Sequence, residues 1–178
     1  MYRLCVIGDP VAHSRSPAIH TALLRQRGME GVYETVTVRP EELAEFVKRA
    51  RAGAYDGFNV TMPHKQAILP LLDAVAEDAA AMGAVNTVVV RQGRATGYNT
   101  DGPGFVATLP GGAADKRVLV LGSGGAASAV SRAVVNTGGR VTVCCRHPEK
   151  TEGWGVTARL WRELPRLAAE CDVLVNAT

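Results

Sequence analysis

A lysine and an aspartate, each in a polar loop, are the residues of this chain best suited to acid–base chemistry. Lys65 ends the segment Asn59-Val-Thr-Met-Pro-His-Lys65, and Asp101 lies among turn-forming residues in Asn99-Thr-Asp-Gly-Pro-Gly104. Reduction of a carbonyl by hydride leaves an alkoxide that needs a proton, and a lysine held by a carboxylate can carry that proton. The spacing alone also allows a structural salt bridge or two unrelated surface charges.

A glycine loop follows the apolar run Val118–Leu121 and precedes a helix-like stretch. Its sequence, Gly122-Ser-Gly-Gly-Ala-Ala127, matches the pattern G-x-G-x-x-A. In such a loop Gly122 permits a tight turn, Gly124 lets a pyrophosphate approach the backbone, and Ala127 allows close packing of helix on strand. This context favours dinucleotide binding over an unliganded turn. Contacts are expected from five consecutive loop residues, Gly122, Ser123, Gly124, Gly125 and Ala126.

The end of the next strand indicates which dinucleotide is bound. The segment Arg146-His-Pro-Glu-Lys150 follows the strand Val141–Cys145, with no acid at the strand end to bond a ribose 2′-hydroxyl. Arg146 and Lys150 are two cations that suit a 2′-phosphate instead. We therefore expect NADP as the cofactor. The alternative is a solvated loop in which Glu149 neutralises Lys150.

Two serines precede the first helix-like stretch, in Ala12-His-Ser-Arg-Ser-Pro17. The hydroxyls of Ser14 and Ser16, with a helix N-terminus behind them, suit a small carboxylate ligand. Helix capping by the same serines is the alternative. Three histidines without a partner acid at a telling spacing are interpreted as packing or hydrogen-bonding residues: His13, His20 and His64.

The hydrophobic pattern predicts an α/β fold that positions these residues, because strand-like runs alternate with helix-like stretches. In the first hundred residues the expected strands are 3–8, 33–38, 57–60, 85–91 and 94–98, and the expected helices are 17–26, 41–52, 65–72 and 74–82. After that the expected strands are 117–121, 140–145, 156–159 and 172–176, and the expected helices are 126–137 and 162–170. The second set corresponds to the first half of a doubly wound nucleotide fold.

The small, flexible segment 110–116 is the one clear linker, and it gives the expected domain boundary. We expect an α/β substrate domain over residues 1–109. The first half of a Rossmann-type, doubly wound nucleotide-binding domain is expected over residues 117–178.

Composition narrows the class of protein further. A hydrophobic share of 47% with 21% charged residues is typical of a globular chain, and no apolar run has the length of a membrane span. A net charge of +3 with scattered arginines gives little support for nucleic-acid binding. The four cysteines have neither disulfide nor metal-pair spacing, and we recognise no signal peptide, so we expect a cytoplasmic protein without a metal site. Whether it forms a homodimer is left open.

Six segments, in this order along the whole chain, resemble the motifs of the shikimate dehydrogenase family. They are 8–17, 59–65, 83–87, 99–102, 122–126 and 176–178. The resemblance implies a two-domain α/β enzyme that reduces 3-dehydroshikimate to shikimate with NADPH, in aromatic amino-acid biosynthesis.

The resemblance also implies roles for individual residues. Lys65 would be the acid–base residue with Asp101 as its partner, and Ser14 and Ser16 would bind the substrate carboxylate. Glu77 would lie near the nicotinamide; an exposed helix residue is the alternative. Four side chains would bind the ring hydroxyls of the substrate: Asn59, Thr61, Asn86 and Asp101. The adenosine phosphate would meet the end of the second nucleotide strand: Cys145, Arg146, His147 and Lys150.

The chain departs from the family pattern in three places. Cys145-Arg-His147 stands where the family often has Asn-Arg-Thr, and two glycines in Thr151–Gly155 curtail the next helix. The family continues beyond Thr178 with further strands and helices. We therefore interpret the chain as truncated and expect it to be weakly active or inactive in isolation.

Two other interpretations stay open. One is a relative that acts on quinate or aminoshikimate. The other is a non-catalytic ligand-binding paralogue, against which the presence of both Lys65 and Asp101 argues.

Overall fold

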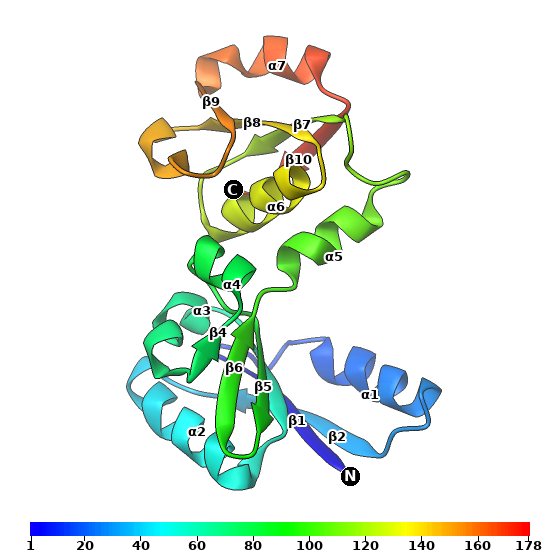
Figure 1. Ribbon diagram of the computed structural model, residues 1–178, viewed down its shortest axis with the longest axis vertical. Helices are drawn as coiled ribbons and strands as arrows, with labels where there is room; N and C mark the ends of the chain where they lie inside the picture. The colour runs from blue at the N-terminus through cyan, green and yellow to red at the C-terminus, as the bar shows by residue number, and fades with distance from the viewer. The chain divides into compact units, whose positions relative to one another are not determined.

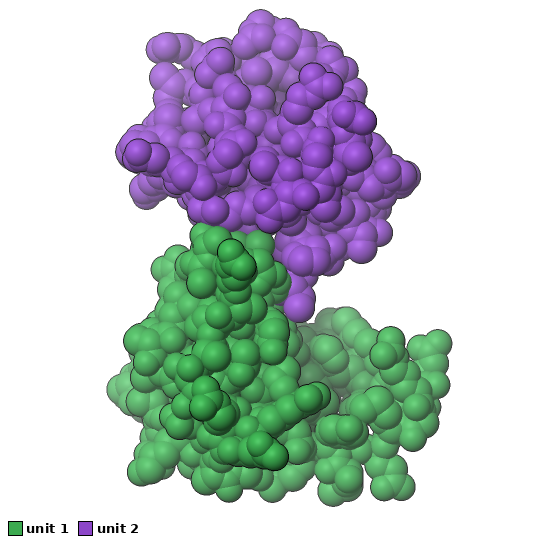
Figure 2. Space-filling model, viewed as in Figure 1, with its two compact units in different colours: residues 1–99 green, residues 100–178 purple.

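The computed structural model describes residues 1–178 and divides into two compact units, Met1–Asn99 and Thr100–Thr178. Figure 2 shows the first in green and the second in purple. The first unit contains β1 (Tyr2–Gly8), α1 (Ser16–Gln26), β2 (Gly31–Thr37), α2 (Leu43–Arg49), β3 (Gly57–Val60), α3 (His64–Ala67), β4 (Ala74–Val75), α4 (Glu77–Met82), β5 (Thr87–Arg91) and β6 (Arg94–Tyr98). The second contains α5 (Asp101–Thr108), β7 (Arg117–Leu121), α6 (Gly125–Asn136), β8 (Arg140–Cys145), β9 (Thr157–Leu160), α7 (Leu164–Glu170) and β10 (Val173–Asn176).

The first unit is built on a mixed six-stranded sheet of order β2-β1-β3-β5-β6-β4 (Figure 1). Strands β2, β1 and β3 are parallel, whereas β5 runs antiparallel to both β3 and β6. The two-residue turn at Gln92–Gly93 joins β5 to β6, and both residues have positive φ, as tight hairpins require. The chain is therefore α/β, as the sequence predicts.

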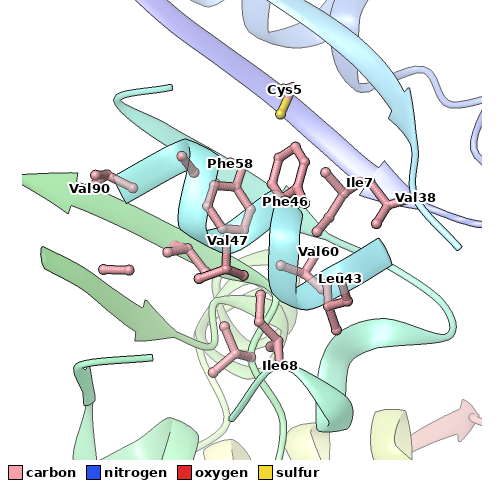
Figure 3. Close-up of a cluster of buried hydrophobic side chains, with 14 of the residues drawn as sticks. Cys5, Ile7, Val38, Leu43, Phe46, Val47, Phe58, Val60, Ile68 and Val90 are labelled. Carbon is pink, nitrogen blue, oxygen red and sulfur yellow. The ribbon is translucent and has the colours of Figure 1, made fainter. Parts of the chain in front are cut away.

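Alternation along the strands separates the face that α2 covers from an opposite face of mixed polar and apolar side chains. Phe58 and Val60 of β3 are buried on the side that α2 covers, where Phe46 meets Phe58 edge to face at a centroid distance of 5.1 Å. Figure 3 shows this core, to which α2 contributes Leu43, Phe46 and Val47. Because side chains alternate with period two, Asn59 points to the opposite face of the sheet.

The second unit is a parallel sheet of order β10-β7-β8-β9. From β9 to β10 this is the order 3-2-1-4 of a doubly wound sheet, so the unit is part of such a fold. Helix α6 covers one face with Ala127, Val130 and Val134, all buried against the valines of β7 and β8. Leu167 of α7 packs with Leu119 and Cys144 on the other face.

Two predicted helices of the first unit are wrong in extent. Helix α3 ends at Ala67, and residues Leu69–Leu71 form a 3-10 turn, because Pro70 cannot continue an α-helix. The helix predicted over 74–82 begins only at Glu77, since Ala74–Val75 pairs with Thr96–Gly97 as strand β4. Asp73 anchors that strand by accepting hydrogen bonds from Arg51 and from the backbone of Ala95.

The two compact units meet between Asn99 and Thr100, whereas the sequence analysis places the domain boundary at the segment 110–116. Helix α5, which the sequence analysis did not predict, belongs to the second unit, and its Phe105 and Val106 pack against the core of that unit. The close approach of α5 to α6 explains why this glycine-rich segment is a helix of the second unit. A Cβ on Gly102 would lie 2.7 Å from the carbonyl oxygen of Ala129 and 2.8 Å from the Cβ of Ala133.

Substitution of Gly102 by alanine is expected to destabilise the second unit by about 1 to 3 kcal/mol, because the added methyl overpacks α5 against α6. The matched control is Gly104→Ala in the same helix. No atom lies within 4 Å of the Cβ that it would add, so it is expected to be neutral or to stabilise by up to about 1 kcal/mol. Urea denaturation followed by tryptophan fluorescence measures both, since Trp154 and Trp161 both pack in the hydrophobic clusters of this unit. Equal effects of the two substitutions would contradict the packing argument.

Candidate active site

A hollow of about 360 Å³ lies on the polar side of the first unit. Three of the predicted substrate-binding side chains line it together: Ser14, Ser16 and Thr61. The apolar part of its wall includes Val6 and Val11. The hollow thus offers three hydroxyl groups beside apolar surface, which suits a small polyhydroxylated ligand.

Local backbone bonds place these hydroxyls. The backbone N–H of Ser14 donates to the carbonyl of Val11, and that of Ser16, the first residue of α1, donates to Ser14 Oγ at 3.2 Å. Thr61 follows β3 and donates its N–H to the carbonyl of Ile7 at 2.9 Å. Gly8 is needed there, because a Cβ would lie 2.5 Å from Thr61 Cγ2 and 2.9 Å from the carbonyl oxygen of Met62.

A hydrogen-bonded network on the same unit contains the predicted residues Asn59 and Asn86. Asn59 Nδ2 donates to the carbonyl of Asn86 at 3.2 Å and to Thr87 Oγ1 at 3.0 Å. Thr87 Oγ1 in turn donates to Asn86 Oδ1 at 2.9 Å. Tyr33 donates its phenolic hydroxyl to Asn59 Oδ1 at 2.6 Å. The structure therefore brings Asn59 and Asn86 together and adds two residues that the sequence analysis missed, Tyr33 and Thr87.

Tyr33 is buried, and both its ring and its hydroxyl have partners. Its ring stacks on that of His20 with a centroid distance of 4.4 Å and an interplanar angle of 4°. Burial raises the pKa of the Tyr33 hydroxyl, with a smaller contribution from Cys5 and an opposing one from a hydrogen bond with Ser16. Burial also lowers the pKa of His20. Both rings are therefore neutral at pH 7, and the Tyr33 hydroxyl acts as a hydrogen-bond donor to Asn59.

Lys65 is half-buried in the short helix α3, next to a fully buried histidine. His64 Nε2 lies 2.6 Å from the carbonyl oxygen of Val38, and the carbonyl of Lys65 accepts a 2.8 Å bond from the N–H of Val85. The role predicted for His64, packing and hydrogen bonding, is confirmed. These bonds anchor the backbone that carries the Lys65 ammonium group.

The other predicted acid–base residue, Asp101, is half-buried in the first turn of α5. Lys65 and Asp101 belong to different compact units, and their pairing stays a prediction. Glu77 is exposed in the first turn of α4, where its charge suits the positive end of the helix. Its place near a nicotinamide also stays a prediction.

The glycine loop of the second unit turns from β7 into α6. Gly122 has a φ of +105°, and a Cβ there would lie 2.7 Å from the carbonyl oxygen of Ala177, so the turn requires glycine. Gly124 precedes α6 and Gly125 begins it, and no atom lies within 4 Å of a Cβ on either. The space beside both glycines is thus open next to the N-terminus of α6, as the approach of a pyrophosphate to that helix end requires. Ser123 and Ala126 flank these glycines in the same loop.

The predicted adenosine-phosphate residues follow the carboxyl end of β8. The N–H of Gly122 donates to the carbonyl of Cys144 at 2.9 Å, so the glycine loop and the end of β8 share one edge of the sheet. Cys145 is buried, whereas Arg146, His147 and Lys150 are exposed. Glu149 Oε1 lies 3.1 Å from His147 Nδ1. The acid that the sequence analysis considered as a partner for Lys150 therefore pairs with His147.

Metal binding and thiol chemistry find little support in the structure. No group of three or more histidine, cysteine, aspartate or glutamate side chains is arranged to hold a metal ion. Burial raises the pKa of the Cys5 thiol to about 12, with a smaller contribution from Glu34, so this thiol stays protonated. No helix combines the length and apolar character that crossing a bilayer requires.

Fold and site together define a class of protein, a two-unit α/β protein with a hydroxyl-lined hollow in one unit and a Rossmann-type glycine loop in the other.

Residues 6–88 match the family described as the shikimate dehydrogenase substrate binding domain. Shikimate dehydrogenase (NADP(+)) of Shouchella clausii is 41% identical over 188 residues, which cover 97% of this chain and 67% of that protein. The same enzyme of a Synechococcus species is 48% identical over 182 residues, covering 98% of this chain and 62% of that protein.

Solved structures agree with these relatives. Shikimate 5-dehydrogenase from Thermus thermophilus, in complex with NADP(H) and shikimate, is 42% identical with a TM-score of 0.90, and the match covers 100% of this chain and 69% of that one. Quinate dehydrogenase from Corynebacterium glutamicum, in complex with NAD, is 33% identical with a TM-score of 0.88, over 99% of this chain and 70% of that one. The chain belongs to the shikimate dehydrogenase family, and it spans about two thirds of the length of these relatives.

Proposed function

We propose that the protein is an NADP-dependent shikimate dehydrogenase, which reversibly reduces 3-dehydroshikimate to shikimate in aromatic amino-acid biosynthesis. The observation that carries the proposal is the hollow in which Ser14, Ser16 and Thr61 converge, in a chain of this family. We further propose that the protein acts in the cytoplasm, as the sequence analysis expects.

Substrate binding follows from the donors and acceptors around the hollow. Ser14 and Ser16 lie at the N-terminus of α1, where hydroxyl groups and the helix dipole both favour a carboxylate. Thr61, Asn59, Asn86 and Asp101 are the side chains proposed to bond the ring hydroxyls. Together they hold the ring in one orientation, so that a single carbonyl is presented for reduction.

Proton transfer is assigned to Lys65. As hydride adds to the carbonyl carbon of 3-dehydroshikimate, the electron pair of the C=O bond moves to oxygen, and the Lys65 ammonium group gives that oxygen a proton. In the reverse direction the neutral amine takes the proton from the hydroxyl. Asp101 stabilises the ammonium form.

Cofactor binding is assigned to the second unit. NADPH supplies the hydride when bound. The glycine loop from Gly122 to Ala126 holds the pyrophosphate on the N-terminus of α6, and Arg146 with Lys150 binds the 2′-phosphate. Cys145 and His147 border the adenosine, and Glu77 is the residue proposed near the nicotinamide.

Activity on quinate is the second candidate, because a quinate dehydrogenase has the same fold at 33% identity. Its solved complex contains NAD, whereas Arg146 and Lys150 favour NADP in this chain. Binding of shikimate and NADP therefore indicates the first candidate, and binding of quinate and NAD indicates the second.

Calorimetric titration of the chain with shikimate, quinate, NADP+ and NAD+ tests the proposal. Binding of shikimate and NADP+ with little affinity for quinate and NAD+ is expected, and the opposite preference would establish the second candidate. Loss of NADPH absorbance with 3-dehydroshikimate is then followed in this chain and in an extended chain, in which the C-terminal part of the Thermus thermophilus enzyme follows Thr178. Sedimentation velocity shows in addition whether two copies form a homodimer.

A further inference from the structure

Asn59 is enclosed by protein hydrogen bonds on the polar face of the first unit. We infer that Tyr33 and Thr87 are positioning residues, which hold the side chains of Asn59 and Asn86 in the orientation that binds the substrate. The inference rests on the proposed function, in which Asn59 and Asn86 bond the ring hydroxyls. It assigns a role to Tyr33, which lies outside the motifs from which the site was predicted, and to Thr87, which ends the motif 83–87 but was given no role there.

Both N–H groups of the Asn59 amide are occupied within the protein. One donates to the carbonyl oxygen of Asn86 at 3.2 Å and the other to Thr87 Oγ1 at 3.0 Å. An amide nitrogen has two protons to donate, whereas the amide oxygen can accept two hydrogen bonds. Tyr33 supplies one of these at 2.6 Å. Asn59 therefore meets a ring hydroxyl only as an acceptor, through the second lone pair of Oδ1.

The sheet brings the three partners to one place. Asn59 of β3 lies directly opposite Thr87 of β5 in the antiparallel pair. Tyr33 reaches Asn59 from β2, across the intervening strand β1, since Leu4 of β1 pairs with Tyr33 on one side and Val6 pairs with Asn59 on the other. Strands fix all three backbones, so the side-chain bonds have little freedom to rearrange.

Thr87 couples the two asparagines through one hydroxyl group. Its oxygen accepts from Asn59 Nδ2, and its proton is given to Asn86 Oδ1 at 2.9 Å. A hydroxyl has one proton, so the direction of this chain of bonds is defined. Valine in place of Thr87 keeps the shape and removes both bonds, whereas serine keeps both bonds and removes only a methyl group.

Substitution of Tyr33 by phenylalanine removes the hydroxyl and keeps the ring in position. The ring is held by stacking on His20 at 4.4 Å, a contact that phenylalanine can also make. Tyr33→Phe leaves Asn59 Oδ1 without its buried donor, so that the amide is held only through its two N–H groups. Loss of the phenolic oxygen thus loosens the side of the binding face that carries Asn59.

The test is calorimetric titration of shikimate into the chain and its variants. Tyr33→Phe and Thr87→Val are each expected to weaken binding about tenfold, because each leaves a polar group of the binding face without its partner. Thr87→Ser is expected to restore affinity to within about twofold of the original. Tyr55→Phe is the matched control, since it removes the tyrosine hydroxyl that donates to Glu34 at 2.8 Å, outside this network. It is expected to leave the affinity unchanged.

The outcomes distinguish this inference from the proposed function. If the unaltered chain does not bind shikimate, the proposed function fails, and the substrate role of the network fails with it. If the chain binds shikimate and both Tyr33→Phe and Thr87→Val bind it equally well, only the positioning role is overturned. Urea denaturation and NADP+ affinity are measured in parallel. A lower free energy of unfolding with unchanged shikimate affinity would show a merely structural role, and that result also overturns the inference.

Discussion

Lys65→Ala is expected to lower kcat for reduction of 3-dehydroshikimate by about 10²- to 10⁴-fold in the extended chain, with a much smaller rise in KM. A proton carrier acts chiefly in the transition state, so its loss affects turnover more than ground-state binding. Asp101→Asn is expected to act in the same direction, because it removes the charge proposed to stabilise the ammonium form. Steady-state kinetics with NADPH absorbance as the readout measures both variants.

The control for this prediction is Lys48→Ala, which removes an exposed lysine of α2 whose nearest acid is Glu45 at 3.7 Å. It should leave kcat and KM unchanged, since exposed ion pairs of this kind contribute little. Near-normal kcat in Lys65→Ala would mean that another group carries the proton, and the acid–base assignment would be withdrawn.

Combined replacement of Arg146 and Lys150 by glutamine is expected to weaken NADPH binding about 100-fold and to leave NADH binding nearly unchanged. Hydrogen bonds to charged groups contribute about 1.5 to 3 kcal/mol each. Both side chains are exposed, so we take the low end of that range for each, and the sum for the pair is close to the roughly 2.7 kcal/mol that corresponds to 100-fold. Fluorescence titration with each cofactor measures the change.

Two further measurements sharpen this prediction. Arg162→Gln removes an exposed arginine elsewhere in the second unit and should affect neither cofactor. Because exposed charges are screened by salt, the NADPH preference of the unaltered protein should also decrease as ionic strength rises. A loss of equal size for NADPH and NADH would show that Arg146 and Lys150 do not recognise the 2′-phosphate.

The elements that carry the glycine loop could be predicted because their signals are local. A run of valine and leucine, three glycines and a long apolar helix follow one another without interruption from Val118 to Thr137, and the structure has β7, the loop and α6 there. The convergence of Ser14, Ser16 and Thr61 was less direct. It followed from the family resemblance and not from spacing, since Gly8 and the β3 strand bring Thr61 to the two serines.

The elements that were missed depend on contacts between distant segments. Gly102, Pro103 and Gly104 are typical of a turn, yet they lie in α5, because the absence of a side chain at Gly102 lets this helix pack on α6. Ala74 and Val75 favour a helix locally and form a strand because β6 offers a pairing edge. In both places the tertiary contact outweighs the local preference.

Tyr33 and Thr87 could not be identified for a different reason. Their bonds to Asn59 require that β2 and β3 flank the same strand and that β5 pairs with β3 in one register. Strand order and register are not readable from a single sequence. The one local signal was the position of Thr87 directly after Asn86, at the start of an apolar strand.

The division into two units, each with its own hydrophobic clusters, gives the protein two separate chromophore systems. All four tyrosines lie in residues 1–99 and both tryptophans in residues 100–178. Because the units have separate cores, their unfolding need not be one cooperative event, and a single melting temperature need not describe the chain. A ligand stabilises each unit that it contacts in the folded state. Tyrosine and tryptophan emission therefore report the unfolding of the two units separately in one sample, without any added label.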